Sequence, residues 1–230
     1  MKKYGKAYRA ILEKVDLTKV YSLEEAVKVV KQTSVTKFDA SIDINFNLNV
    51  NPTLADQLIR GTITLPHGNG KTKKVLVVTN TKLEEAKESG AEYFGGVEML
   101  EKIRTQNWFD FDVIVATPDM MGELGKMGRV LGPKGLMPNP KTGTVTMDVK
   151  GAVADIKRGK IAYRVDKHGN LSMPIAKVSF SEQDLLDNLE AVVDAIAKAR
   201  PSTVKGTYIR NIALSTTMGP AVYVTFAGRN

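Results

Sequence analysis

The sequence predicts a two-domain protein of mixed α+β and α/β class, in which a discontinuous α+β domain is interrupted by an inserted βαβ-type domain. Both ends of the chain combine strands with amphipathic helices, whereas the middle alternates short buried strands with helices, as a mostly parallel sheet does. The pattern of predicted strands and helices changes at two glycine-containing stretches, "HGNG" and "KRGK". The chain is expected to cross between the domains there and to form a hinge. The expected bounds are 1–66 plus 160–230 for the discontinuous domain, 67–159 for the insert, and 66–70 and 157–160 for the hinge.

The first flank contains two predicted helices followed by two predicted strands. A helix is expected over 4–15, and a second opens at Ser22, where "SLEE" places Glu25 three residues after a serine cap. The segment "ASIDINFNLNV" at 40–50 alternates apolar and polar residues over its whole length, which predicts a strand with one buried and one wet face. A further strand, "GTITLP", ends at Pro66.

The middle of the chain contains two continuous apolar runs that predict strands covered on both faces. These runs are "KVLVVT" at 74–79 and "FDVIVATP" at 111–118. Helical patterns lie between and after them, together with one brief apolar piece, "AEYFGG". The predicted helices are "TKLEEAKES" at 81–89, "VEMLEKIRT" at 97–105, "DMMGELGKMG" at 119–128 and "AVADIKRG" at 152–159.

The second flank, like the first, combines predicted strands with an amphipathic helix. "KIAYRVDKHGNLSMPIAKV" predicts a hairpin that turns at His168, Gly169 and Asn170. Ser181 is expected to cap a long amphipathic helix that Pro201 stops. "TYIRNIALS" and "AVYVTF" are then two closing strands, joined by "TTMGP" at 216–220.

Composition limits the class of protein. The chain has 230 residues, of which 43% are hydrophobic and 25% charged, which is ordinary for a globular protein. Its apolar runs are far shorter than the roughly 20 residues that span a bilayer, and the basic N-terminal stretch lacks the pattern of a secretory signal. The absence of cysteine excludes disulfides, thiolate zinc sites and cysteine nucleophiles, and a reducing cytoplasm is the simplest location.

Charge favours a polyanionic partner. The net charge is +8 and the isoelectric point is near 9.5, which favours nucleic acid first and an anionic membrane second. Residues 67–159 hold 14 basic and 12 acidic residues, so the two flanks together hold the other 19 basic and 13 acidic ones. The basic excess therefore belongs to the predicted discontinuous domain.

The stretch "LPHGNGKT" at 65–72 resembles the end of a phosphate-binding loop, whose pattern is G-x-x-x-x-G-K-[ST]. Counting back from Gly70, the first glycine of that pattern falls on Leu65, and a strand follows where a helix is required. The sequence therefore argues against a nucleotide site. A nucleotide-dependent enzyme that uses the insert is the weaker alternative.

The sequence does not indicate a catalytic site, a metal site or a cofactor site. The two histidines, His67 and His168, lie far apart in the sequence and neither has carboxylates at ligand spacing. No serine occupies a G-x-S-x-G elbow, and the paired glutamates lie on amphipathic helices, where a solvated face is the ordinary arrangement. We expect no catalytic residue, no metal and no cofactor.

Three further stretches have two interpretations each. "GRVLGPKGLMPNPKTGTV" at 128–145, too rich in glycine and proline for a helix or a central strand, is either an ordinary surface loop or a rigid basic loop that presents cations to an anion. "KFDAS" pairs an aromatic with a lysine, as a nucleic-acid contact does, although a core phenylalanine beside an exposed lysine is the commoner case. "TTMGP" suits either a rigid nucleic-acid surface or a plain turn. The cations of the first stretch are Arg129, Lys134 and Lys141.

Together with "VATPDMMG", "TLPHGNGK", "KFDASIDI" and "STTMGPAVYVTF", the glycine–proline stretch closely resembles one ribosomal protein family. This is the bacterial form of the first-numbered protein family of the large ribosomal subunit, carried by the mobile stalk beside the tRNA exit site. The resemblance covers essentially residues 1–228, and the spacing of the segments shows no departure from the family.

The resemblance implies a function and a fold that composition does not. The discontinuous domain is expected to bind a structured helical region of large-subunit ribosomal RNA, and the insert is expected to be Rossmann-like, with three layers and no dinucleotide fingerprint. The stalk is expected to move and help discharged tRNA to leave, and the protein to repress translation by binding its own operon mRNA. The implied protein is a non-enzymatic monomer outside the ribosome, has no membrane partner and works in the cytoplasmic ribosome.

The resemblance also implies an RNA-binding surface made of three short segments. Asp43 is the carboxylate of this set, and we expect it to accept a hydrogen bond from a 2′-hydroxyl or a base amine. For "TTMGP", the resemblance favours the functional interpretation over the plain turn. The implied residues are Lys37, Phe38 and Asp43, then Arg164, Asp166 and Lys167, then Thr217, Met218 and Gly219.

Overall fold

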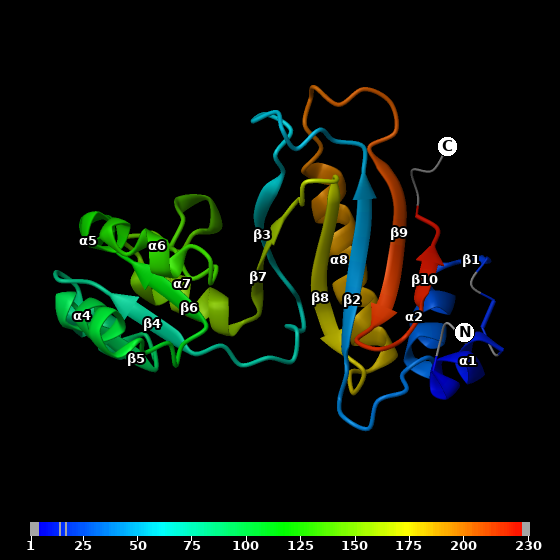
Figure 1. The fold of residues 1–230 in the computed structure, drawn as a ribbon, viewed down its shortest axis with the longest axis horizontal. Helices are drawn as coiled ribbons and strands as arrows, with labels where there is room; N and C mark the ends of the chain where they lie inside the picture. Colours follow the sequence, from blue (N-terminus) through cyan, green and yellow to red (C-terminus); the bar gives the residue numbers. More distant parts are fainter. Residues whose placement is uncertain (1–4, 14, 17, 227–230) are drawn as a thin grey trace. The chain divides into compact units, whose positions relative to one another are not determined.

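The computed structural model describes residues 5–13, 15–16 and 18–226 of the chain. The chain divides into two compact units, one made of residues 1–70 and 161–230 and the other of residues 71–160. Among the described residues, unit 1 has two sheets and one hydrophobic core, whereas unit 2 has one three-stranded sheet with a core on each face. We call them unit 1 and unit 2, and their elements are labelled in Figure 1.

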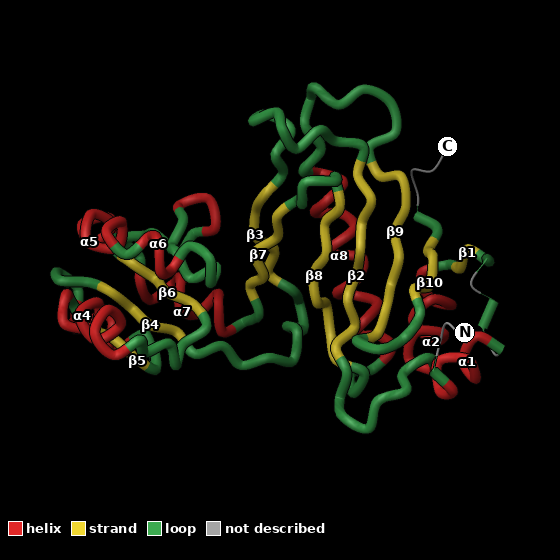
Figure 2. Tube along the Cα trace, viewed as in Figure 1, coloured by secondary structure: helices red, strands yellow, loops and turns green. Residues whose placement is uncertain are grey.

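Unit 1 is built on a five-stranded sheet of order β1-β10-β9-β2-β8 (Figure 2). β1 runs parallel to β10, and the other neighbours are antiparallel. Every second residue of β2 is buried, so the alternating strand expected at 40–50 is confirmed. The bounds are β1 Val20–Tyr21, β2 Ser41–Leu48, β8 Asn170–Lys177, β9 Ile209–Thr216 and β10 Ala221–Val224.

Two helices, α2 (Leu23–Gln32) and α8 (Glu182–Lys198), pack against one face of this sheet and share a core with its buried residues. Both predicted caps are confirmed. The Ser22 hydroxyl accepts from the Glu25 amide at 3.3 Å, and the Ser181 hydroxyl accepts from the Asp184 amide at 3.1 Å. α1 covers Lys6–Leu12, so the helix predicted over 4–15 ends earlier than expected, and Val15 lies beyond it in a bend. Of the predicted range, Tyr4 and Lys14 lie outside the described residues.

A two-stranded sheet of unit 1 corrects the predicted hairpin at 160–178. β7 (Lys160–Arg164) pairs with β3 (Arg60–Thr64), whereas β8 pairs with β2. The chain does turn between these strands, because the Asp166 carboxylate accepts from the amides of His168 and Asn170, each at 2.8 Å. The turn redirects the chain into a different sheet, where the apolar side of β8 joins the core on β2.

Unit 2 is built on a parallel sheet of order β5-β4-β6 with helices on both faces. β4 is buried along its whole length, as predicted, because its alternate residues enter two different cores, one packed with α4 and α5 and the other with α3 and α7. The bounds are β4 Val75–Val78, β5 Tyr93–Gly95, β6 Val113–Ala116, α3 Leu83–Glu88, α4 Val97–Gln106, η1 Pro118–Met120, α5 Met121–Lys126, α6 Gly128–Leu131, η2 Pro140–Thr142 and α7 Val149–Lys157.

The glycine–proline stretch at 128–145 opens as a helical turn, α6, so the expectation that it holds no helix is wrong at its start. Its first proline, Pro133, follows this turn, and Leu131 is completely buried in the core of unit 2. Burial of the leucine outweighs the low helix propensity of Gly128. Among the described residues, no helix has both the length and the apolar composition that crossing a bilayer requires.

Candidate nucleic-acid interface

The sheet of unit 1 has a polar face opposite the one that α2 and α8 cover, and we call it the open face. Figure 1 shows both helices behind the sheet and the strands β8, β2 and β9 in front. Asparagine and serine dominate this face, and one aromatic residue, Tyr223, stands on it. The open face consists of Ser41, Asp43, Asn45, Asn47, Asn170, Ser172, Pro174, Asn211, Ala213, Ser215, Ala221 and Tyr223.

One end of the open face carries the exposed "KFDAS" segment. Phe38 is 60% exposed and Lys37 is exposed, so the interpretation of Phe38 as a core residue is wrong. The backbone beside them is anchored, because the Asp39 carboxylate accepts from the amide and the hydroxyl of Ser179 at 3.1 and 2.8 Å. An exposed ring on an anchored segment can stack on a base without first losing much conformational entropy.

The β9–β10 turn lies at the same end. The Thr217 amide donates to the carbonyl of Ser41 at 3.1 Å, and the Thr217 hydroxyl accepts from the Ser41 amide at 3.1 Å. Met218 at the tip is 61% exposed. A side chain on Gly219 would lie 2.2 Å from the Thr216 hydroxyl and 3.2 Å from the Thr33 carbonyl, so only glycine fits this close approach. The structure thus brings the first and third predicted segments together.

Asp43 lies one row further along the open face, between Ser215 of β9 and Pro174 of β8. Its neighbours in sequence, Ile42 and Ile44, are fully buried, which fixes Asp43 on the polar side. A ligand on the open face can therefore reach the half-buried carboxylate.

The second predicted segment lies at the opposite end of the open face. Arg164 ends β7 and is exposed, as is Lys167. Hydrogen bonds from the backbone amides of Asn170 and His168 hold the pKa of the Asp166 carboxyl below its usual range. Asn170 pairs with Asn47, near the far end of β2 from Ser41. At about 3.3 Å per residue, the two groups of predicted residues are roughly 20 Å apart.

The site residues predicted from the sequence do not include the row of asparagines that lies between these two ends. Asn45, Asn47 and Asn211 all lie on the open face, although asparagine is depleted in strands generally. The repeated asparagines of "DINFNLN" could have indicated a functional face, because a strand face that only meets solvent seldom repeats a residue with low strand propensity. Cations stand at the ends of the face and amides in its middle, which matches phosphate contacts flanking contacts to sugars and bases.

The basic loop of unit 2 is fixed by local hydrogen bonds. The Asn139 amide donates to the Thr144 hydroxyl at 2.8 Å, and the Asn139 side chain accepts from the Lys141 amide at 2.8 Å. Lys134 places its Nζ 4.2 Å from the centre of the Phe109 ring. Arg129 and Lys141 are exposed, so this loop presents spaced cations to solvent.

The "HGNG" stretch serves unit 1 by contacting α8. The buried Asn188 side chain accepts from the His67 amide at 3.1 Å and donates to the Gly68 carbonyl at 2.9 Å. The His67 ring lies 3.0 Å from the Asp187 carboxylate and 3.6 Å from that of Asp184. Within the described ranges, no group of three or more histidine and acidic side chains could hold a metal ion.

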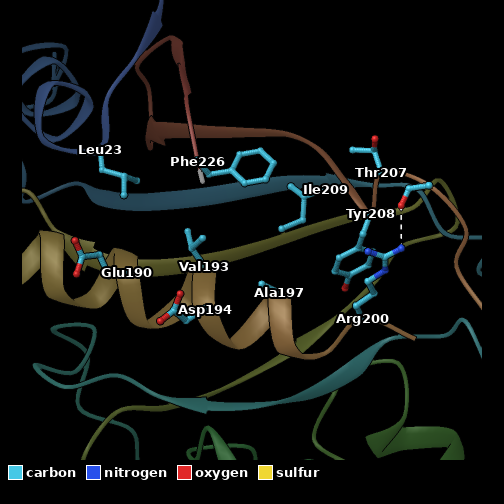
Figure 3. A pocket seen from close by; sticks show the side chains of 11 residues that line it. Leu23, Glu190, Val193, Asp194, Ala197, Arg200, Thr207, Tyr208, Ile209 and Phe226 are labelled. Atoms are coloured by element: carbon cyan, nitrogen blue, oxygen red, sulfur yellow. Dashed lines mark hydrogen bonds between the residues drawn. The ribbon is translucent and has the colours of Figure 1, made fainter. Parts of the chain in front are cut away.

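A hollow of about 680 Å³ lies along α8 on the helix-covered side of the sheet (Figure 3). Val193 and Phe226 contribute apolar surface to it, and Glu190 and Asp194 line it from α8. Arg200 donates to the carbonyls of Val204 and Gly206 at 3.0 and 2.9 Å. The carboxylates here and the engaged guanidinium do not suit a phosphate-bearing ligand.

A polar sheet face with exposed cations at both ends is the arrangement expected of one class of protein, the nucleic-acid-binding modules. Residues 30–220 match the model of the Ribosomal protein L1p/L10e family, and the chain belongs to that family. The family resemblance described from the sequence is therefore confirmed.

Three relatives span nearly the whole chain, and each bears the name large ribosomal subunit protein uL1. The protein of Mycoplasma capricolum subsp. capricolum is 56% identical over 226 residues, which cover 98% of this chain and 100% of the relative. That of Mycoplasma mycoides subsp. mycoides is 55% identical with the same coverage, and that of Mesoplasma florum is 54% identical over 97% of this chain and 99% of its own. Since these relatives are ribosomal proteins, the chain is not an enzyme, as the sequence predicted.

Proposed function

We propose that the chain is a structural constituent of the large subunit of cytoplasmic ribosomes and binds large-subunit ribosomal RNA in the mobile stalk through the open face. The observation that carries this proposal is the β9–β10 turn. Thr217 ties the turn to Ser41 with two hydrogen bonds, while Met218 stays 61% exposed beside the exposed Phe38 segment. A turn this tightly held, with an apolar side chain exposed at its tip, is preorganised for a partner.

The contacts divide into two kinds along the open face. Lys37 at one end and Arg164 and Lys167 at the other neutralise backbone phosphates, which supplies the salt-dependent part of the affinity. The asparagines and Asp43 between them contact 2′-hydroxyls and base edges, which a wide, shallow RNA minor groove displays. The face therefore recognises a folded RNA more by shape than by sequence.

The finer roles that we propose follow the family. The RNA-binding domain comprises 1–66 plus 160–230, a Rossmann-like insert over 67–159 joins it at a hinge, and the protein is a monomer outside the ribosome. Motion of the stalk helps discharged tRNA to leave the exit site, and the same open face binds the operon mRNA to repress translation. The loop with Arg129, Lys134 and Lys141 adds phosphate contacts from unit 2.

Filter binding with the full chain tests the central proposal. The chain is titrated with large-subunit and small-subunit ribosomal RNA at equal nucleotide concentration and fixed ionic strength. We expect saturable binding to the large-subunit RNA that survives an excess of small-subunit RNA. Equal affinity for the two RNAs would show binding by charge alone and refute the proposed site.

A further inference from the structure

The middle of the open face contains a hollow with an aromatic wall. Tyr223 of β10, Ala213 of β9, Asn45 of β2 and Ser172 of β8 are in register, so they form one row across four strands. Ala213 is the smallest residue of this row and lies between Tyr223 and Asn45. A hollow of about 330 Å³ lies here and is lined by these four residues together with neighbouring asparagines.

The Tyr223 ring is available to a ligand. Its side chain is 42% exposed, and within the described part of the chain no second ring and no cation lies over it. Tyr223 also lines a second hollow, of about 220 Å³, which it shares with Asn211 and Val20. A tyrosine bordered by open space is a stacking platform, because every nucleobase offers a π-face.

The polar groups around the hollow suit the edge of a base. The Asn47 side-chain amide donates one hydrogen to the side-chain Oδ1 of Asn170 at 2.7 Å, and the Asn45 side-chain amide donates one to the Ser215 hydroxyl at 3.4 Å. An asparagine amide has two donor hydrogens and an acceptor oxygen, so each keeps capacity for further bonds. The Asn211 side chain forms no hydrogen bond with any residue that the structure describes. Amides that both donate and accept match the mixed donor and acceptor edge of a base.

The charges that line the hollow favour a nucleobase over a phosphate as its occupant. The lining of the hollow includes neither lysine nor arginine and includes one carboxylate, that of Asp166. A phosphate placed here would meet a negative charge and no compensating cation. An uncharged base, whose amino and imino hydrogens can donate, avoids this repulsion.

We propose that this hollow holds one unpaired nucleobase of the bound RNA, stacked on Tyr223 above Ala213, with its edge hydrogen-bonded by the surrounding asparagines. The inference rests on the proposed function, because it requires RNA on the open face. The hollow would let the protein prefer an RNA with an extruded nucleotide to a continuous helix, because only an unpaired base can leave its stack.

Substitutions at Tyr223 test this proposal in the full chain. Tyr223→Ala is expected to lower the affinity for large-subunit ribosomal RNA by about 5- to 150-fold, the range that one stacked base contributes, whereas Tyr223→Phe retains the ring and most of the affinity. Phe94→Ala is the matched control, because Phe94 is a 37% exposed aromatic on a strand of unit 2. It should leave the affinity unchanged.

A second variant fills the hollow and leaves the tyrosine in place. Ala213→Leu should weaken binding as well, and probing of base edges should show one nucleotide protected by the unaltered chain and reactive in complexes with either variant. Full affinity and unchanged protection with both Tyr223→Ala and Ala213→Leu would overturn this inference and leave the proposed function intact. Failure of the unaltered chain to bind the RNA would overturn both.

Discussion

Replacing Met218 by glutamate tests the contact at the β9–β10 turn. Fully burying a methionine side chain contributes roughly 1.5–3 kcal/mol, so covering the 61% of Met218 that is exposed contributes roughly 1–2 kcal/mol. The new carboxylate also meets phosphate charge, and two charges about 4 Å apart in water repel by about 1 kcal/mol. The sum, about 2–3 kcal/mol, corresponds to a loss of affinity of about 30- to 150-fold.

The matched control is Met147→Glu, because Met147 is a 50% exposed methionine of unit 2 and the charge change is the same. Filter binding of both variants to large-subunit ribosomal RNA, at one ionic strength, measures the difference. Both should unfold within a few degrees of the unaltered chain, since neither side chain belongs to a core. Equal affinities for the two variants would refute the assignment of the turn to the interface.

The remaining predictions concern salt, helix capping and acid stability. If about five phosphates are neutralised, the log–log plot of the RNA-binding constant against salt should have a slope of roughly −4 to −5, and a slope near zero would contradict phosphate contact. Ser181→Ala removes the cap of α8 and should lower the free energy of unfolding in urea by about 1 kcal/mol, whereas Ser202→Ala in an exposed loop should not. The pKa of Asp166 is lowered in the folded chain, so its stabilising contribution is complete above the unfolded value near 4 and is lost as the pH falls through the folded value. Asp166→Asn should therefore weaken the acid dependence of stability below about pH 4, and an unchanged dependence would contradict this role.

Local signals in the sequence predicted local structure well. The caps at Ser22 and Ser181 are decided within three residues, and both form as expected. The alternation in β2 depends only on the side-chain period of a strand, and it too is confirmed. Each of these features is fixed by neighbours in sequence.

Features decided by distant partners could not be predicted in this way. The supposed hairpin at 160–178 contains a real turn, but the partner of β8 is β2, more than a hundred residues earlier. Exposure of Phe38 depends on packing with segments far along the chain, so residue type alone favoured the core. The row through Tyr223 and Ala213 exists only because three strand registers coincide, and no pattern in the sequence encodes that coincidence.

The central claim is that the two ends of the chain form one RNA-binding face, and ultraviolet cross-linking of the full chain to large-subunit ribosomal RNA tests it most directly. Mass spectrometry then identifies the cross-linked residues. We predict cross-links at Phe38, Met218 and Tyr223, which stand exposed on or beside the open face. Cross-links confined to residues 71–160, or to the outer side of α8, would contradict the account.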